Sequence, residues 1–321
     1  MRLGIYGYGN LGRFAEANAK LFEDVELVGV FTRRNVKDVK TLGTPVYPAE
    51  DVLSFKDKID VLFIAGGSAN DLPVMTPQLA KDFNVIDSFD NHSMMVEHVS
   101  AVNESAKQSG HLALVAAGWD PGVFSLERMI FDSFLPNGKS YTFWGRGVSQ
   151  GHSNAIRRIE GVKDARQYTN PRPEALETVR SGKMEDMNAQ SMHTRECYVV
   201  AEDGADKTEI ERKIKTMPGY FEGYETTVNF ISQEELDKNH SGLPHGGFVM
   251  RNGQGNSFTH RLEFALNLGS NPEFTSSVIL AYSRALFRLY KEGVRGCITV
   301  ADVAPKYLCR EEGMDLIHKY I

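Results

Sequence analysis

Three glycines near the start of the chain have the spacing of a phosphate-binding turn. Gly7, Gly9 and Gly12 lie in the segment GYGNLG, between an apolar run and a helical pattern. In this context the first glycine permits a tight turn, the second lets a pyrophosphate approach the backbone, and the third lets helix and strand pack closely. The helix start then offers unpaired N–H groups to the phosphates. A glycine-rich turn without a ligand is the alternative, and the strand–helix context favours a dinucleotide.

Two arginines point to the type of dinucleotide. The second apolar run ends in Thr32, Arg33 and Arg34, where an NAD-binding protein usually has an acidic residue for the ribose hydroxyl. Guanidinium groups bind a phosphate, which a carboxylate would repel. A solvated surface pair is the alternative, but the position of these residues predicts NADP.

Small and acidic residues follow the next apolar runs. The segment FIAGGSAND ends in residues that let a cofactor lie close to the backbone, namely Gly66, Gly67, Ser68 and Ala69. VIDSFDNH contains Asp87 and Asp90, and GWDPG places Asp120 after a further run. Ligands in open α/β sheets bind beyond the carboxyl ends of the strands, so we expect Asp90 and Asp120 near the nicotinamide.

Two carboxylates at this place suit a substrate with an ammonium group on the reacting carbon. Such an acid would hold the amine through a charge-assisted hydrogen bond and orient it for hydride loss. Asp120 has a structural alternative, because Asp before Pro121 is a good helix start. Asp120 is also a candidate for moving a proton or orienting the attacking water, with His152 as the alternative base.

The second half of the chain offers a pocket wall and groups that bind a carboxylate. The segment TFWGRGVSQGHS combines Phe143 and Trp144 with glycines, and it predicts a wall from which Ser149 and Gln150 face a polar substrate. Four residues are candidates for anchoring a carboxylate, although each is more often structural in its setting: Thr169, Arg195, His245 and Asn271.

The elements that position these residues fall into two classes. Up to residue 118, near-continuous apolar strands alternate with helices, which predicts a Rossmann-type, doubly wound parallel sheet of the α/β class. The expected strands are residues 3–6, 27–31, 61–65, 85–87 and 112–116, and the expected helices include 11–21 and 94–108.

After residue 120 the pattern changes to alternating polarity. This predicts a second, α+β domain with a mixed or antiparallel sheet, and its expected strands are 140–145, 193–202, 224–231, 247–252 and 257–268. A helical pattern returns at 274–293, and we expect it to pack on the first domain. The expected domains are therefore 1–118 with 272–321, and 119–271.

The composition of the chain argues against several classes of protein. With 36 basic and 42 acidic residues the formal net charge is −6, which argues against a general nucleic-acid binder. No run approaches the ~20 apolar residues of a membrane span, and the N-terminus shows no signal-peptide pattern. Cys197, Cys297 and Cys309 lack metal-type spacing, and the nine histidines form no H-E-x-x-H pair. We predict no metal, no membrane partner and reduced cysteines in a cytoplasmic protein.

Eight segments together carry a family likeness: GYGNLGR, FTRRN, SFDNH, GWDPGVFS, TFWGRGVSQGHS, IKTMPGYF, HSGLPHGGFV and SNPEFTSS. From residue 2 to about residue 305 the chain resembles the meso-diaminopimelate dehydrogenase family of bacterial lysine biosynthesis. The resemblance implies that NADP⁺ takes a hydride at nicotinamide C4 from the D α-carbon of meso-2,6-diaminopimelate. It implies that the iminium is hydrolysed, reversibly, to L-2-amino-6-oxopimelate and ammonia. It also implies a homodimer, with substrate-binding and dimerisation roles for residues 119–271.

The resemblance further assigns residues by motif. Asp90 and Asp120 look like the catalytic, substrate-facing acids. The pocket wall is then Trp144, Gln150 and Gly151, and the remaining substrate ligands, which hold the end that does not react, are Thr169, Arg195, His245 and Asn271. The implied cofactor contacts are Tyr8, Gly9, Asn10, Leu11, Thr32, Arg33, Arg34, Gly66, Gly67, Ser68, Ala69, Ser88, Phe89, Asp90, Ala117, Gly118, Trp119, Asp120 and Pro121.

One position departs from the family pattern, and two other functions remain as alternatives. Asn154 stands where similar proteins often carry Asp, and if this position helps to position the loop, binding is expected to differ modestly. The nearest alternative is another NADP reductase of lysine metabolism, such as a dihydrodipicolinate reductase. The other is an NADP-sensing regulator with an inactive catalytic site, which would have little use for both acids together with Arg195 and His245.

Overall fold

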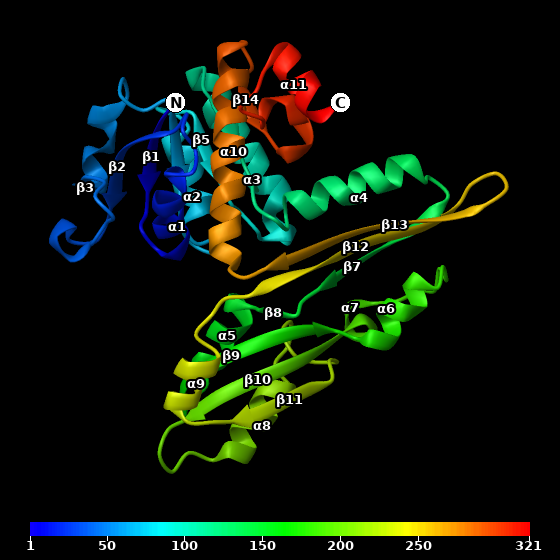
Figure 1. The fold of residues 1–321 in the computed structure, drawn as a ribbon. Coiled ribbons are helices and arrows are strands. Elements are labelled where there is room, and N and C mark those ends of the chain that lie inside the picture. The colour runs from blue at the N-terminus through cyan, green and yellow to red at the C-terminus, as the bar shows by residue number, and fades with distance from the viewer. The chain divides into compact units, whose positions relative to one another are not determined.

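A computed structural model describes residues 1–321. The chain forms two compact units, which Figure 1 shows as ribbons. Unit 1 is Met1–Leu126 with Pro272–Ile321, and unit 2 is Glu127–Asn271. None of the helices combines the length and the apolar character needed to cross a lipid bilayer.

Unit 1 contains a seven-stranded parallel sheet in the order β14-β6-β5-β4-β1-β2-β3. The strands are β1 Arg2–Tyr6, β2 Glu26–Thr32, β3 Val46–Pro48, β4 Val61–Ile64, β5 Val85–Asp87, β6 Leu112–Leu114 and β14 Gly296–Ile298. The doubly wound α/β class is confirmed. The patterns missed β3 and β14, because three residues are too few to show a periodicity.

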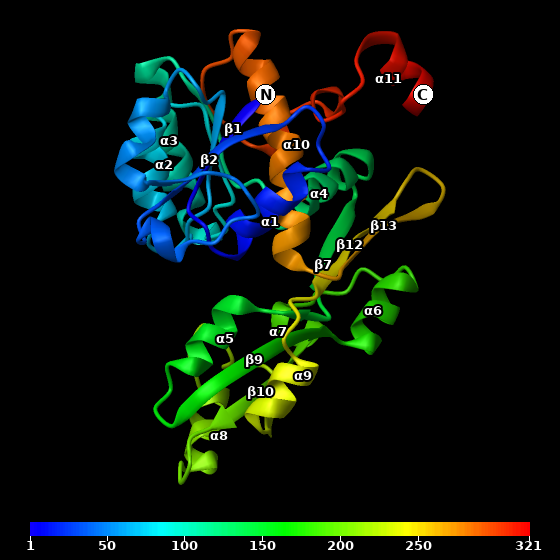
Figure 2. The same cartoon turned by 60° about the vertical axis from the view of Figure 1, so that its left-hand side comes forward.

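Helices cover both faces of this sheet. Figure 2 shows α2 and α3 along one face and α1 and α10 along the other. The predicted return helix is α10, and its Ile279 and Leu286 are buried in one core with Leu3 and Ile5 of β1. The helices are α1 Asn10–Ala19, α2 Leu72–Leu79, α3 Met95–Ser109, α10 Asn271–Lys291 and α11 Gly313–Tyr320, while α4 Val123–Phe134 passes from unit 1 into unit 2.

Unit 2 contains two sheets rather than the single one expected. The four-stranded sheet has the order β11-β10-β9-β8, with β8 Gly147–Val148, β9 Val162–Pro171, β10 His193–Ala201 and β11 Thr226–Phe230. The three-stranded sheet has the order β13-β12-β7, with β7 Gly138–Trp144, β12 His245–Gln254 and β13 Thr259–Leu268. All pairs are antiparallel except β10 with β11, which is parallel because helix α8 forms the crossover between them.

Helices give each of these sheets its own core. Ile156 of α5 and Ile210 and Ile214 of α8 are buried with Cys197 of β10. Val179 of α6 and Met192 of α7 are buried with Phe143 of β7 and Met250 of β12. The helices are α5 Gln150–Arg157, α6 Pro173–Arg180, α7 Ala189–Met192, α8 Lys207–Lys215 and α9 Gln233–Asn239.

Candidate functional site

The predicted cofactor contacts lie at one edge of the parallel sheet. They occupy the carboxyl ends of five strands that are adjacent in the sheet, β2, β1, β4, β5 and β6. The segments are 32–34 at the end of β2, 7–12 after β1, 66–69 after β4, 88–90 after β5 and 117–121 after β6. This is the edge where open α/β sheets bind their ligands.

The glycine turn has the geometry that a pyrophosphate requires. Gly7 has φ +100°, and a Cβ atom there would lie 2.5 Å from the carbonyl oxygen of Ala65. A Cβ atom on Gly12 would lie 2.4 Å from the carbonyl oxygen of Gly7, so helix α1 packs tightly on β1. At Gly9 a Cβ atom would meet nothing within 4 Å, and no side chain caps the helix that follows. The turn therefore leaves open space and free N–H groups for phosphate oxygens.

The two arginines lie beside this turn. Arg34 donates from Nη2 to the carbonyl oxygen of Tyr8 at 2.6 Å, and its N–H binds Oγ1 of Thr32 at 3.1 Å. Arg33 pairs through Nη2 with Oδ1 of Asp71 at 2.9 Å, and its side chain is 61% exposed. Both guanidinium groups therefore lie within one loop cluster, with Arg33 open to a phosphate from solvent.

Asp71 and Glu16 support this cluster, and neither was selected from the sequence. Oδ2 of Asp71 accepts the N–H of Gly67 at 3.0 Å, and this bond, followed by the charge of Arg33, lowers the pKa of Asp71. Glu16 is buried in α1, bonds the hydroxyl of Tyr8, and accepts the N–H of Thr44 at 3.1 Å. Glu16 reaches Tyr8 and Thr44, 8 and 28 positions away, and Asp71 reaches Arg33 across 38 positions, so no local pattern indicates these contacts.

Asp90 and Asp120 follow neighbouring parallel strands, β5 and β6. Asp90 is exposed, and its N–H donates to Oγ of Ser68 at 3.1 Å. Helix α4 begins at Val123, so Gly122 and not Asp120 takes the position before its first residue. Asp120 instead lies in the turn closed by a bridge between Trp119 and Gly122. Asp120 thus lies two positions before the residue that directly precedes the helix.

In unit 2, the segment after β7 lies between two other strands. Trp144 is opposite Gly247 of β12, and Gly147 is opposite Thr169 of β9. Gly147 lies against the imidazole of His245, where a Cβ atom would come within 2.4 Å of the ring. The N–H of Asn271 binds the carbonyl oxygen of Leu243 at 2.9 Å, two residues before His245. The structure thus brings these predicted residues of unit 2 together.

Arg195 is the arginine among these predicted residues of unit 2. It lies opposite Thr169 in the β9–β10 ladder, donates to the threonine hydroxyl, and stacks 4.2 Å above the ring of Tyr224. Burial lowers the pKa of its guanidinium, no acidic side chain pairs with it, and its Nε has no hydrogen-bond partner. Oε1 of the neighbouring Gln167 is also buried without a partner. A guanidinium that no acid neutralises, like that of Arg195, is suited to bind an anion from outside the chain.

Two neutral histidines contact the segment that is predicted to form the pocket wall. Nε2 of His193 accepts the N–H of Trp144 at 2.8 Å, so its Nδ1 donates to the carbonyl oxygen of Ala189, and the two rings stack. His152 bonds Oγ of Ser149 through Nδ1 at 2.7 Å. Burial, and then the charge of Arg195, lowers the pKa of His152 to about 4, and burial chiefly lowers the pKa of His193 to about 4. The sequence analysis did not select His193.

Gln150 and Gly151 form the exposed first turn of α5, which Ser149 caps. Asn154, where the resemblance led us to expect Asp, accepts a hydrogen bond from Arg157, which also contacts Asp164 at 3.4 Å. The amide oxygen of Asn154 therefore supplies the same kind of acceptor that a carboxylate would.

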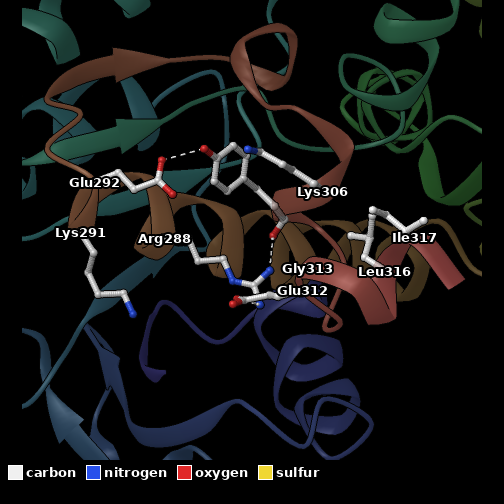
Figure 3. Close-up of a pocket in the computed structure, with 9 residues that line it drawn as sticks. Arg288, Lys291, Glu292, Lys306, Glu312, Gly313, Leu316 and Ile317 are labelled. Carbon is white, nitrogen blue, oxygen red and sulfur yellow. Dashed lines mark hydrogen bonds and ion pairs between the residues drawn. The ribbon is translucent and has the colours of Figure 1, made fainter. Parts of the chain in front are cut away.

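A cavity of about 700 Å³ lies elsewhere, beside α10 and α11 (Figure 3). Four of its lining residues bond one another: Tyr307 donates to Glu292 at 2.6 Å, and Arg288 pairs with Glu312 at 2.6 Å. None of the predicted site residues lines it. No group of three or more His, Cys, Asp and Glu side chains is placed to hold a metal ion, and all three cysteines are unpaired.

Comparisons with known proteins cover nearly the whole chain. Residues 118–270 match the family model described as the diaminopimelic acid dehydrogenase C-terminal domain. The meso-diaminopimelate D-dehydrogenase of Acetivibrio thermocellus is 51% identical over 321 residues, which span 98% of this chain and 96% of that protein.

Two solved structures share the fold. The Clostridium tetani meso-diaminopimelate dehydrogenase, solved with DAP, has a TM-score of 0.95 at 46% identity and covers 100% of this chain and 99% of its own. That protein carries substitutions of a Gln, a Thr, an Arg, a Pro, a His and an Asn. An engineered D-amino acid dehydrogenase bound to NADP⁺ has a TM-score of 0.89 at 43% identity, with 100% of this chain and 99% of that chain covered.

Proposed function

The chain belongs to the meso-diaminopimelate D-dehydrogenase family, and from this premise we propose which of its residues carry out the reaction. It is an NADP-dependent oxidoreductase of lysine biosynthesis that acts on meso-diaminopimelate. This identity decides against the two alternatives, a dihydrodipicolinate reductase and an inactive NADP-sensing regulator.

Unit 1 would hold the cofactor. The glycine turn fits the pyrophosphate, because Gly9 leaves open space and the helix start is uncapped. Arg33 and Arg34 would bind the additional phosphate of NADP, and segments 66–69, 88–90 and 117–121 would lie beside the nicotinamide. When bound, NADP⁺ supplies the acceptor for the hydride that leaves the substrate.

Asp90 and Asp120 would act on the reacting end of the substrate. Their carboxylates would bind the ammonium group of the D-centre and orient its α-carbon. Asp120 would also orient the water that attacks the iminium and receive its proton. His152 is the weaker candidate for this base, because its pKa of about 4 is far from neutral pH and its Nδ1 already bonds Ser149.

The observation that carries the substrate assignment is the partly buried guanidinium of Arg195, which no acidic side chain neutralises and whose buried Nε has no partner. Meso-diaminopimelate has a second carboxylate at its unreactive end, and Arg195 and Thr169 would bind it, with His245 and Asn271 beside them. Trp144, Gln150 and Gly151 would form the wall. The six residue types substituted in the Clostridium tetani protein recur here in the same order, as Gln150, Thr169, Arg195, Pro244, His245 and Asn271.

Unit 2 would also provide the contact for a homodimer. Three large apolar side chains of α4 are exposed, Met129, Ile130 and Phe134, the last at 71%. A helix with such an exposed apolar side fits burial against a second copy.

We place the reaction in the cytoplasm, where the unpaired cysteines stay reduced.

The proposal is tested by following NADPH absorbance in the intact protein. With NADP⁺, meso-2,6-diaminopimelate and the D,D-isomer should produce NADPH, whereas the L,L-isomer, which lacks a D-centre, should not. Absence of signal with the meso isomer at alkaline pH, or equal rates with the L,L-isomer, would contradict it.

A further inference from the structure

The proposed mechanism leaves one buried carboxylate beneath the catalytic edge unused. Asp87 is the last residue of β5, and it is fully buried. Oδ1 accepts the N–H groups of Phe89 at 3.1 Å and Ala116 at 3.0 Å. Oδ2 accepts from Oγ1 of Thr76 at 2.8 Å and lies 2.7 Å from Nε2 of His98. This set of partners suits an ionised carboxylate, which only accepts hydrogen bonds.

These bonds reach both loops that carry the proposed catalytic acids. Phe89 directly precedes Asp90, so the bond to its N–H fixes the first of these loops at its base. Ala116 begins the segment that leads to Asp120, and the next N–H, of Ala117, binds the carbonyl oxygen of Asp87 at 3.0 Å. One residue thus joins two loops that are separate along the chain.

The backbone conformation of Ala116 depends on its hydrogen bond to Asp87. Ala116 has φ +59°, and it is the one residue other than glycine with a positive φ. A residue with a Cβ atom is strained in this region, so surrounding bonds must hold it there. The bond from its N–H to Asp87 holds the turn that directs the chain toward Asp120.

His98 completes the arrangement from α3. Its ring stacks on Phe89 with the ring centroids 4.0 Å apart, and its Nε2 contacts Asp87. Its Nδ1 is buried without any hydrogen-bond partner. A buried unpaired nitrogen costs stability that an apolar side chain would not, so the ring is poorly explained as a stabilising element alone.

We infer that Asp87, oriented by His98, is a positioning residue that holds the loops of Asp90 and Asp120 in one fixed arrangement. The inference rests on the roles proposed above for these two acids. A displacement of about 1 Å at either acid is enough to lower turnover about 100-fold. Only the nicotinamide end of NADP⁺ would lie beside the loops that Asp87 holds. The pyrophosphate turn and the arginine pair follow β1 and β2, which Asp87 does not contact, so these two contacts with the cofactor are independent of Asp87.

Asp87→Ala tests the positioning role, and its matched control lies just before the other end of the same strand. Asn84 directly precedes β5 at its other end, is buried, and bonds Leu112 and Asp60 at 3.0 Å each. We expect Asp87→Ala to lower kcat about 100-fold while the Kd of NADP⁺ changes by less than about threefold. Asn84→Ala should lower thermal stability yet keep kcat within about twofold. Asp87→Asn, which keeps an acceptor at Oδ1, should have a kcat at least about tenfold higher than that of Asp87→Ala.

The outcomes separate the inference from the proposed function. Equal kcat values for Asp87→Ala and Asn84→Ala, or no recovery in Asp87→Asn, would overturn the positioning role. If Asp87→Ala does not fold, His98→Phe keeps the stacked ring and removes the bond to Asp87, and a wild-type kcat for it would overturn the inference. Asp90→Asn and Asp120→Asn are measured alongside. If Asp90→Asn and Asp120→Asn keep the wild-type kcat, the roles proposed for these acids fail. If their kcat falls while the Asp87 and His98 variants keep the wild-type kcat, only the positioning role fails.

Discussion

Arg195 lies directly opposite Thr169 in the antiparallel ladder of β9 and β10, and its guanidinium donates to the threonine hydroxyl. The ladder therefore sets the position of the charge, and the stack on Tyr224 keeps its plane fixed. No acid within the chain neutralises it, so an anionic ligand is the partner that its burial calls for.

Arg195→Gln should weaken binding of the substrate with two carboxylates. The loss of a charged hydrogen bond, about 2 kcal/mol, should raise the KM for meso-diaminopimelate roughly 30-fold. The KM for NADP⁺ and the rate with a D-amino acid that has only one carboxylate should change little. Arg212→Gln, at an exposed ion pair on α8, is the control. An unchanged KM for meso-diaminopimelate would remove Arg195 from the substrate site.

Arg33→Ala and Arg34→Ala should each weaken the binding of NADP⁺ but not that of NAD⁺. Loss of a charge-assisted bond to phosphate should raise the KM for NADP⁺ about 10-fold or more, with kcat retained at saturation. The KM for NAD⁺, which lacks that phosphate, should stay within about twofold, and the ratio of the two KM values is the measurement. A parallel rise for both cofactors would mean that the arginines support the turn rather than bind the phosphate.

Acid should destabilise the fold through His193. Burial lowers the pKa of His193 from 6.5 to about 4, so the unfolded chain binds a proton that the folded chain does not. The stability that neutral His193 provides is complete above pH 6.5 and is lost as the pH falls toward 4, by up to about 3 kcal/mol.

His193→Gln provides the comparison, because its amide can accept the N–H of Trp144 and donate to Ala189 but does not titrate. The free energy of unfolding in urea, measured between pH 7 and pH 5, should fall less steeply in the variant than in the wild type. Identical slopes would show that folding does not lower the pKa of His193.

Ile130→Ser together with Phe134→Ser should dissociate the proposed homodimer. Both side chains are exposed in the isolated chain, so their replacement leaves the cores of both units intact. Sedimentation velocity should give twice the chain mass of 35.8 kDa for the wild type and one chain mass for the double variant. A monomeric wild type, or a double variant that stays dimeric, would refute this interface.

The sequence predicted those parts of the candidate site whose positions follow from the order of strands and helices along the chain. Asp90 and Asp120 follow neighbouring parallel strands, so their common edge could be inferred from strand positions alone. The glycine turn was predictable for the same reason. The parallel pair β10–β11 was not, because alternation of polarity does not reveal strand direction.

The supporting contacts were beyond prediction because they join distant positions. His193 reaches the N–H of Trp144 across 49 positions, and Asp71 pairs with Arg33 across 38. Asp87 was visible as a strand end, but nothing local indicated that its carboxylate would bind Ala116, 29 positions away. Such pairs depend on which strands and helices become neighbours, which only the folded chain defines.

The central claim is that Asp120 takes part in the reaction and does not merely start a helix. The most direct measurement is the kcat of Asp120→Asn with NADP⁺ and meso-2,6-diaminopimelate, alongside its circular dichroism and its Kd for NADP⁺. The amide keeps the shape but neither binds the ammonium group as an ion pair nor accepts a proton, so kcat should fall about 100-fold or more with fold and cofactor affinity intact. A kcat equal to that of the wild type would contradict the account.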